Sequence, residues 1–240
     1  MKKISRAIYW SILKAGGITP EKKNAVFHQR RQQELIGDYL AGHQVRKLQI
    51  GAQSNSITGW LNVDIAPKSK DVCYMDATQP FPIGDDSFDY VYAEHMIEHI
   101  PFEHALFMLR ECCRILKPGG RIRIATPDLS SLVRIMTSPD QPEHKEYILH
   151  YRERFFPELP ADPAFVVNKL FYGFHHRFIH NFFTLHYLLD TAGFSQVSQE
   201  TVGSSPDPLL CNMEQHWKEM GELPNRVETI VVEGVKVTDQ

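Results

Sequence analysis

The chain has 240 residues, of which 42% are hydrophobic and 23% charged, and its 29 acidic and 26 basic side chains leave a formal charge of −3. This composition is that of a globular protein with a sizeable core, and the length predicts one large domain or one domain with an insertion. The near-neutral charge argues against binding to a nucleic-acid backbone, which requires a basic stripe. Four cysteines without a C-x-x-C pair argue against a disulfide scaffold or a cysteine-rich zinc site. Twelve histidines are an excess, and six of them lie between His144 and His186.

Residues 1–44 are expected to form an N-terminal helical leader. The first part is basic and then apolar, but Lys14 interrupts the apolar patch and no A-x-A cleavage site follows, so a signal peptide is disfavoured. We expect an amphipathic helix that packs Ile8, Ile12 and Leu13 on the domain, with peripheral membrane contact as the alternative. No segment approaches the roughly 18 consecutive apolar residues of a membrane span, and we expect a cytoplasmic protein.

The domain proper is expected over residues 45–240. Short apolar runs bounded by turn residues predict four strands, at residues 45–50, 61–65, 71–75 and 88–93. A helix is expected from Pro101, because the following apolar positions recur at spacings of four and three residues, namely Phe102, Leu106, Leu109, Cys113 and Leu116. Proline suits the first turn of a helix, where its missing N–H is not needed.

The second half of the chain continues the alternation of strands and helices. A tight Lys-Pro-Gly-Gly turn at 117–120 introduces a strand at 121–125, and a helix at 184–192 is closed by Gly193. Strands at 195–202 and 229–237 follow, joined by a polar loop rich in proline. Strands alternating with helices predict an α/β fold, a Rossmann-like doubly wound and mostly parallel sheet with helices on both faces.

This rhythm breaks at residues 139–183. The stretch is dense in aromatic residues: 12 of the 26 in the chain lie between Tyr147 and Tyr187. A disordered linker would lack such apolar content. We therefore expect a helical, aromatic-rich cap inserted over one end of the sheet.

The residues at the predicted strand ends define the candidate ligand site, because open α/β sheets bind ligands at the carboxyl ends of their strands. These ends are rich in carboxylates and poor in Lys and Arg, and include Gly51, Ala52, Gln53, Asp64, Asp76, Glu94 and His95. The sequence contains neither a P-loop nor a G-x-G-x-x-G fingerprint. The short stretch between Gly51 and Leu61 leaves little room for a helix that would bind a pyrophosphate. The site is expected to suit a ligand with hydroxyls, a purine and positive charge.

Five motifs together resemble the class I S-adenosylmethionine-dependent methyltransferases. They are Leu-Gln-Ile-Gly at 48–51, Gly-Trp-Leu-Asn-Val-Asp-Ile at 59–65, Pro-Phe-Pro-Ile-Gly-Asp-Asp-Ser-Phe-Asp at 80–89, Ala-Glu-His-Met-Ile-Glu-His at 93–99 and Leu-Lys-Pro-Gly-Gly-Arg-Ile at 116–122. The resemblance covers roughly residues 45–130 and is strongest to the branch with a Gly-Trp-x-Asn-x-Asp second strand. It implies a seven-stranded sheet whose last strand is antiparallel, with S-adenosyl-L-methionine as cofactor.

Carried onto this chain, the resemblance implies a role for each strand end. Gly51, with Ala52 and Gln53, would pass under the methionine part of the cofactor. Asp64, with Ile65, would hold the ribose. Asp76 and Ala77 would flank the adenine, and Glu94 or His95 would close the pocket. The chain departs from the family at Gln53, where a second glycine is usual, which puts the close approach of the backbone in question. Asp64 and Asp76 as ordinary loop or capping carboxylates are the alternative.

Methyl transfer to a hydroxyl benefits from a general base, and histidine is the usual one. The candidates are His95, His99, His175, His176 and His180. Two other readings stay open for the last three: packing among aromatics without a catalytic role, or a metal site with Asp162, since residues at i and i+4 share a helix face. The preferred interpretation names no metal ligand.

The sequence thus predicts a methyltransferase acting on an oxygen or nitrogen of a small or medium acceptor, with the cap forming the acceptor pocket. A sugar-related acceptor is suggested by analogy with the branch alone. A nucleic-acid acceptor is disfavoured by the charge balance. The alternatives are a non-catalytic methyltransferase-like binding module, favoured by Gln53, and a nicotinamide-dependent oxidoreductase, disfavoured by the missing glycine fingerprint.

Overall fold

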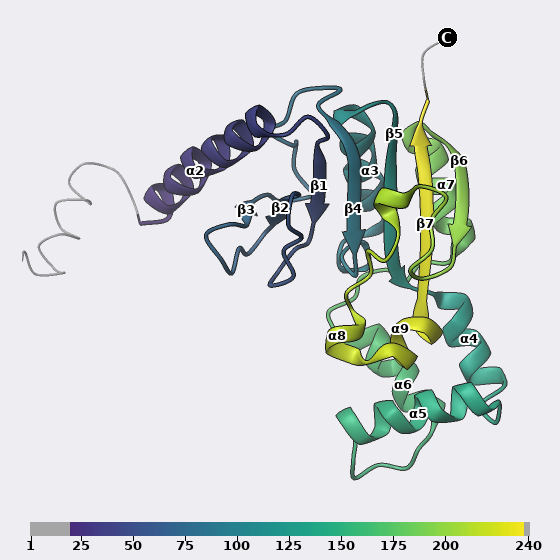
Figure 1. Ribbon diagram of the computed structural model, residues 1–240. Coiled ribbons are helices and arrows are strands. Elements are labelled where there is room, and N and C mark those ends of the chain that lie inside the picture. Colours follow the sequence, from purple (N-terminus) through teal and green to yellow (C-terminus); the bar gives the residue numbers. More distant parts are fainter. Residues whose placement is uncertain (1–19, 238–240) are drawn as a thin grey trace, which may run out of the picture.

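The computed structural model describes residues 20–237, which form a sheet with helices against it and a helical cap below its lower edge (Figure 1). The predicted contacts of Ile8, Ile12 and Leu13 lie outside the described residues. The leader's later part is the helix α2, Pro20–Gly42. None of the helices in residues 20–237 combines the length and the apolar character that crossing a bilayer would need.

The sheet has seven strands in the order β3-β2-β1-β4-β5-β7-β6. Their bounds are Lys47–Ile50 (β1), Leu61–Asp64 (β2), Cys73–Tyr74 (β3), Phe88–Glu94 (β4), Leu116–Pro127 (β5), Phe194–Glu200 (β6) and Thr229–Lys236 (β7). β1 to β5 pair in parallel, and β7 runs antiparallel to both β5 and β6. The predicted Rossmann-like fold, with an antiparallel last strand, is confirmed.

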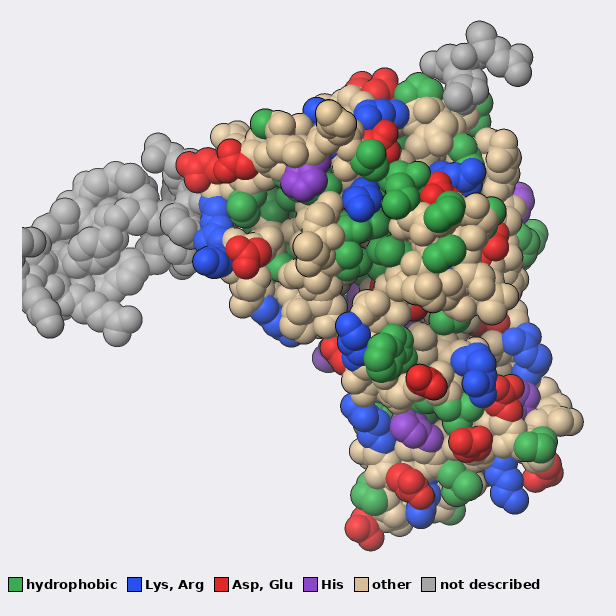
Figure 2. All heavy atoms as spheres, in the orientation of Figure 1, with side chains coloured by type: hydrophobic (Ala, Val, Ile, Leu, Met, Phe, Trp, Pro, Cys, Tyr) green, Lys and Arg blue, Asp and Glu red, His purple; other side chains and the backbone are tan. Residues whose placement is uncertain are grey.

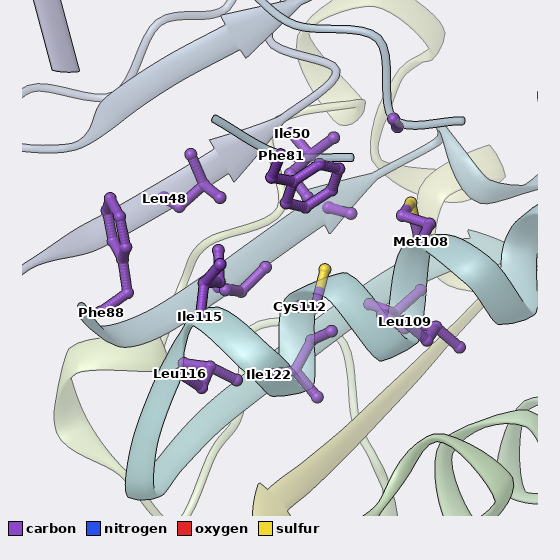
Figure 3. Close-up of a cluster of buried hydrophobic side chains, with 14 of the residues drawn as sticks. Leu48, Ile50, Phe81, Phe88, Met108, Leu109, Cys112, Ile115, Leu116 and Ile122 are labelled. Carbon is purple, nitrogen blue, oxygen red and sulfur yellow. The ribbon is translucent and has the colours of Figure 1, made fainter. Parts of the chain in front are cut away.

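Helices α3, Phe102–Ile115, and α7, Phe182–Ala192, pack against each other and against β5, β6 and β7. The predicted helix from Pro101 is confirmed, and Pro101 occupies its N-cap. Figure 3 shows the core that this face of the sheet encloses, with Leu48, Phe88 and Ile122 from the strands facing Met108 and Cys112 of α3. These side chains are fully buried. The burial of apolar surface therefore holds the helix against the strands.

The Lys-Pro-Gly-Gly segment forms part of β5 and is not a separate turn. Gly119 has φ +78°, and a Cβ on Gly120 would lie 2.8 Å from the carbonyl oxygen of Lys117. The pairing of β4 with β5 shifts register between Phe88 and Tyr90, beside this segment. The two glycines therefore provide an irregular stretch within one long strand.

The first crossover contains no helix, as the sequence predicts. Residues 51–60 connect β1 to β2 by turns alone, and the stretches before β3 and β4 are also free of helices. The carboxyl ends of β1 and β2 are consequently bordered by loops.

The cap is made from two segments, whereas one is predicted. The first contains α4, Leu129–Thr137, α5, Pro142–Phe155, α6, Pro163–Asn168, and the π-helical turn Lys169–Gly173. The second contains α8, Trp217–Met220, and α9, Glu222–Glu228, which the sequence suggests to be a loop. Buried side chains of both segments share a second apolar cluster, including Tyr147, Tyr151, Leu170 and Met220. The predicted boundaries of 139–183 are therefore too narrow, because the second segment packs through tertiary contacts between short helices.

The second segment is tied to the sheet by a buried arginine. Arg123 on β5 has no exposed surface and contacts Glu214 at 2.7 Å and Glu233 of β7 at 2.5 Å. Its guanidinium also donates to the carbonyl oxygen of Ser204 at 2.9 Å. Beside this network, Trp60, Tyr92, Leu210 and Met213 form a small apolar cluster. The loop before α8 is thus held on the face of the sheet.

Candidate active site

A cavity of about 350 Å³ lies between the carboxyl ends of β1, β4 and β5 and the cap. The strand ends contribute Gln49, Gly51, Gln53, Asn55, Glu94, His95, Glu98, His99 and Pro127. The first cap segment contributes Tyr151, Leu170, Gly173, Phe174, His175 and His176, and the second contributes His216, Glu219, Met220 and Glu228. The cavity therefore joins the predicted cofactor side to the predicted acceptor side.

The charge of this lining is one-sided. Four glutamates line the cavity, and no Lys or Arg is among the described residues that do so. A positively charged ligand would find carboxylates here, and the five histidines of the lining carry positive charge only when protonated. The lining therefore suits the positively charged ligand that the sequence predicts.

Gly51 ends β1 in a conformation that requires glycine. Its φ is +79°, and a Cβ at this position would lie 2.6 Å from Cγ of Met96. The N–H groups of Gly51 and Ala52 both donate to the carbonyl oxygen of Val63, at 2.9 and 3.0 Å. The loops after β1, β2 and β4 are thereby packed closely together, which leaves backbone and no side chain at this part of the cavity.

Gln53 adopts the backbone conformation that a glycine would take. Its φ is +42°, in the left-handed region that costs a non-glycine residue roughly 1–2 kcal/mol. Its N–H donates to Oδ2 of Asp64 at 2.9 Å. Replacing the family's usual glycine by Gln53 therefore adds backbone strain, but the loop keeps the backbone conformation that a glycine would adopt.

Asp64 and Ile65 lie at the end of β2, where the resemblance places the ribose. Asp64 is 7% exposed, and its two carboxylate oxygens accept from the N–H groups of Gln53 and Ala66. Each oxygen retains a free lone pair. Ile65 is 61% exposed, an unusual environment for a large apolar side chain. Neither residue lines the cavity itself, so they flank it.

Asp76 and Ala77 follow β3. Oδ1 of Asp76 accepts from the N–H and the hydroxyl of Thr78, at 2.9 and 2.7 Å, so this carboxylate caps the turn that follows β3. Ala77 is buried. Both residues also lie outside the cavity.

Glu94 joins the sheet to the second cap segment. Its Oε1 accepts from the N–H groups of Gln215 and His216, at 2.7 and 2.8 Å. Burial raises the pKa of Glu94, although these two hydrogen bonds and the nearby histidines oppose the shift. The predicted role in closing the pocket thus has a structural counterpart, because the carboxylate holds the segment that covers it.

His95 follows Glu94 and has a left-handed backbone, with φ +45°. Its ring stacks on His216 at a centroid distance of 3.8 Å, and its Nδ1 lies 3.3 Å from Oε1 of Glu98. Burial lowers the pKa of His95, but contact with Glu98 and the charges of Glu98, Glu228 and Glu94 outweigh it and raise the value. Burial likewise raises the pKa of Glu98, yet the contact with His95 and the charges of His95, His99 and His176 lower it to about 2.

His99, His175 and His176 also line the cavity. The rings of His99 and His176 meet edge to face with centroids 4.9 Å apart. Burial lowers the pKa of His176. His175 is exposed and has φ +63°. His99, which follows β4, and His176, which lies in the cap, are therefore in contact with each other.

His180 does not line the cavity. It is fully buried, it pairs with Asp128 in an isolated β-bridge, and its Nδ1 lies 3.3 Å from Oγ1 of Thr184. Burial lowers the pKa of His180 to about 4. Residues 174–181 form no helix, so the helix face expected for His176 and His180 is absent, and Asp162 caps α6 by accepting from the N–H of Ala164. The metal group considered for these residues is not assembled.

Four residues of the second cap segment line the cavity and are absent from the sequence-based site: His216, Glu219, Met220 and Glu228. Glu228 accepts from the hydroxyls of Tyr147 and Tyr151, and its Oε1 lies 3.8 Å from Nε2 of His216. The signal that could have found them is the length of the stretch between the last two strands, which is too long for a simple connection.

Comparison with known proteins agrees with the predicted family over part of the chain. The family described as methyltransferase domain matches residues 48–124. No curated protein matches the chain.

Solved structures that resemble this chain come from several organisms. A methyltransferase from Thermotoga maritima, titled a possible histamine N-methyltransferase, is 18% identical, with 95% of this chain and 99% of that chain covered and a TM-score of 0.46. A methyltransferase from Archaeoglobus fulgidus is 17% identical, with 95% and 99% covered and a TM-score of 0.46. Phosphoethanolamine N-methyltransferase 2 of Haemonchus contortus, bound to phosphomonomethylethanolamine and S-adenosylhomocysteine, is 16% identical, with 87% and 53% covered and a TM-score of 0.44.

Because these TM-scores lie below 0.5, we assign the fold from the strand order alone. The segment that the family matches contains all five motifs on which the resemblance rests. The Gly-Trp-x-Asn-x-Asp branch stays a prediction. Residues 48–124 thus match the methyltransferase domain family, the family that the motifs resemble.

Proposed function

We propose that the protein transfers a methyl group from S-adenosyl-L-methionine to an oxygen or nitrogen of a small or medium acceptor that enters between the sheet and the cap. The observation that carries the proposal is a single cavity whose lining combines the strand ends of a methyltransferase domain with carboxylates and without Lys or Arg. A sulfonium and an ammonium group are the positive charges that such a lining would attract.

The residues present fit this cofactor. Gly51 leaves room beside the loop, Asp64 keeps acceptor lone pairs for the ribose hydroxyls, and the exposed Ile65 offers an apolar surface beside them. The cofactor supplies an already activated methyl group. The chain's own residues would then hold donor and acceptor in line, which can contribute several kcal/mol to lowering the barrier.

A hydroxyl-bearing acceptor, such as a saccharide, suits the other half of the cavity. Tyr151 and Phe174 provide aromatic surfaces, and histidines and glutamates provide hydrogen-bonding groups. The first and the second cap segments both line this half of the cavity, so both would limit which acceptors fit.

Calorimetric titration with S-adenosylhomocysteine tests the cofactor site. We expect one binding site and a raised melting temperature, since a ligand that binds the native state stabilises it. Asp64→Asn should weaken binding by roughly tenfold or more, because hydrogen bonds to charged groups contribute about 1.5–3 kcal/mol. Asp162→Asn, a capping carboxylate outside the cavity, is the matched control and should bind normally. No binding to folded, ligand-free protein would favour the non-catalytic module.

The base hypothesis is tested by single alanine replacements, with transfer of a labelled methyl group to a panel of saccharides, phenols and amines as the readout. The variants are His95→Ala, His99→Ala, His175→Ala, His176→Ala and His180→Ala. Loss of turnover in a cavity-lining variant that still binds the cofactor would support a base, whereas unchanged turnover in all five would exclude one among them.

A further inference from the structure

Three potential metal ligands from two parts of the chain converge in the cavity. Glu98 and His99 lie in the short 3-10 helix Ile97–His99 after β4, and His176 lies in the first cap segment. One ligand atom from each of these residues lies within 4.8 Å of the other two. All three residues line the cavity.

The backbone holds this group together. The N–H groups of Arg177 and Phe178 donate to the carbonyl oxygen of Glu98, at 2.6 and 3.2 Å. The chain next to His176 is thereby attached to the residue that supplies the carboxylate. The two sides are therefore preorganised and do not depend on side-chain contacts alone.

Two polar atoms of the group lack a hydrogen-bond partner although they are buried. Glu98 has no exposed surface, and its Oε1 makes no hydrogen bond of good geometry, only the 3.3 Å contact with His95 Nδ1. Nδ1 of His176 is also buried and unpartnered. Unsatisfied buried polar atoms are rare and costly. A ligand that accepts their lone pairs would satisfy both.

The surroundings of Glu98 resemble those of a metal ligand. Its second oxygen, Oε2, accepts from the hydroxyl of Thr126 at 2.9 Å, which fixes the orientation of the carboxylate. Such hydrogen bonds outside the ligand shell are usual at protein metal sites.

We propose that Glu98, His99 and His176 bind one divalent transition-metal ion, with zinc as the best match. Two imidazoles and one carboxylate suit zinc and its neighbours in the first transition row, whereas magnesium and calcium prefer ligand sets made of oxygen. Three protein ligands leave at least one coordination position free, and because all three residues line the cavity, that position would be open to a molecule bound there.

Resting on the proposed function, this site assigns the acceptor to molecules with a hydroxyl group. The ion would bind the acceptor oxygen and make its O–H bond more acidic. The proton leaves to water in the cavity, and an oxygen lone pair forms the new bond to the methyl carbon. The carbon–sulfur bond breaks with its electron pair remaining on sulfur, which converts the sulfonium cofactor to the thioether S-adenosylhomocysteine.

Calorimetry on the tag-free full chain, stripped with a chelator, tests the site directly. We expect zinc to bind with a stoichiometry near one and magnesium to bind at least 100-fold more weakly. His176→Ala and Glu98→Gln should each weaken zinc binding at least 100-fold. His175→Ala changes the neighbouring cavity histidine that is outside the group, and it should leave zinc affinity within about threefold. Cobalt added to the stripped protein should give a visible absorption band that His176→Ala abolishes.

Each outcome has a distinct meaning. Absence of zinc binding, or equal losses in His175→Ala and His176→Ala, would overturn the metal site. Melting curves of each variant identify misfolding, and His176→Ala, at a partly exposed position, keeps the test valid if Glu98→Gln fails to fold. Binding of S-adenosylhomocysteine without zinc binding would overturn the metal site alone. Zinc binding without S-adenosylhomocysteine binding would overturn the proposed function alone.

Discussion

His216 stacks on His95 with ring centroids 3.8 Å apart, and this contact joins the second cap segment to the end of β4. The two residues belong to parts of the chain that are distant in sequence. The neighbouring hydrogen bonds to Glu94 use only the backbone of Gln215 and His216. The imidazole of His216 is therefore the side chain through which this segment contacts the strand end.

We expect His216→Ala to lower the free energy of unfolding by about 1 kcal/mol, since aromatic pairs contribute roughly 0.5–1.5 kcal/mol beyond burial. Urea unfolding measures the change, and hydrogen exchange should increase within residues 215–228. His104→Ala, at an exposed position on α3, is the control. Unaltered exchange in that stretch would show that the stack does not hold the segment.

Gly51→Ala should cost more stability than Gly59→Ala, and the pair separates two effects. Both glycines have φ near +79°, but a Cβ at Gly51 would meet Met96 whereas a Cβ at Gly59 would meet nothing within 4 Å. The left-handed backbone should cost each variant roughly 1–2 kcal/mol, and the contact with Met96 should add about 1–3 kcal/mol at Gly51. Adding Met96→Ala to Gly51→Ala removes Cγ but keeps Cβ, which would lie 2.8 Å from the new Cβ, so it should restore only part of the lost stability. Equal melting temperatures for the two single variants would contradict this account.

Gln53→Gly should stabilise the protein slightly. Relief of the left-handed conformation is worth roughly 1–2 kcal/mol, and the greater entropy of unfolded glycine removes about 0.5–1 kcal/mol of this gain. Gln196→Gly is a control of the same residue type, with φ +50° on β6 away from the cavity. Both variants should gain stability, measured by chemical unfolding. Only Gln53→Gly should alter affinity for S-adenosylhomocysteine, so a matching change in Gln196→Gly would place the effect elsewhere.

Arg123→Met should destabilise the protein by about 3–5 kcal/mol, because it leaves buried carboxylates without their partner. The carboxylates are those of Glu214 and Glu233. Arg121→Met, on the same strand, removes a half-exposed arginine 3.4 Å from Asp207 and should cost no more than about 1 kcal/mol. Similar losses in the two variants, measured by urea unfolding, would contradict the importance given to burial.

Glu111→Gln should reduce the loss in the free energy of unfolding that the protein shows as the pH falls. Hydrogen bonds from Arg114 are the main cause that lowers the pKa of Glu111 below its usual 4.5, with burial opposing. A lowered pKa in the folded state means that the carboxylate stabilises the protein above pH 4.5 and that this stability is lost as the pH falls through the folded value. The variant should be less stable than the parent at pH 7 and nearly equal to it at low pH. Parallel profiles would argue against the assigned linkage.

Local patterns were sufficient for the sheet. Short apolar runs bounded by turn residues predicted its strands, which are largely buried, and the apolar stripe from Phe102 predicted α3, which is buried on one face. The same holds for Gly51, whose position at a strand end required no tertiary information. The left-handed backbone of Gln53 was not predictable, since only the loop packing with Asp64 shows that a glutamine occupies a glycine conformation.

The cap could be located but not divided correctly from the sequence. Its first segment is marked by aromatic density, but α8 and α9 are short, and their place at the cavity depends on contacts with Glu94 and with Tyr147 and Tyr151. The different environments of the cap histidines also depend on tertiary contacts. His180 is buried beside Asp128, whereas His176 meets His99 across the cavity, and no spacing in the sequence distinguishes these two environments.

The division of the cap in two has a consequence for how the protein becomes functional during its synthesis. The strand ends after β1, β4 and β5 and the first cap segment are synthesised before residues 216–228, four of which line the cavity. β7 follows these residues and completes the sheet between β5 and β6. Contacts between such distant parts of a chain form late because their loop-closure entropy must first be overcome. We therefore expect the cavity, whose lining comes from the strand ends and from both cap segments, to be among the last parts of the molecule to form.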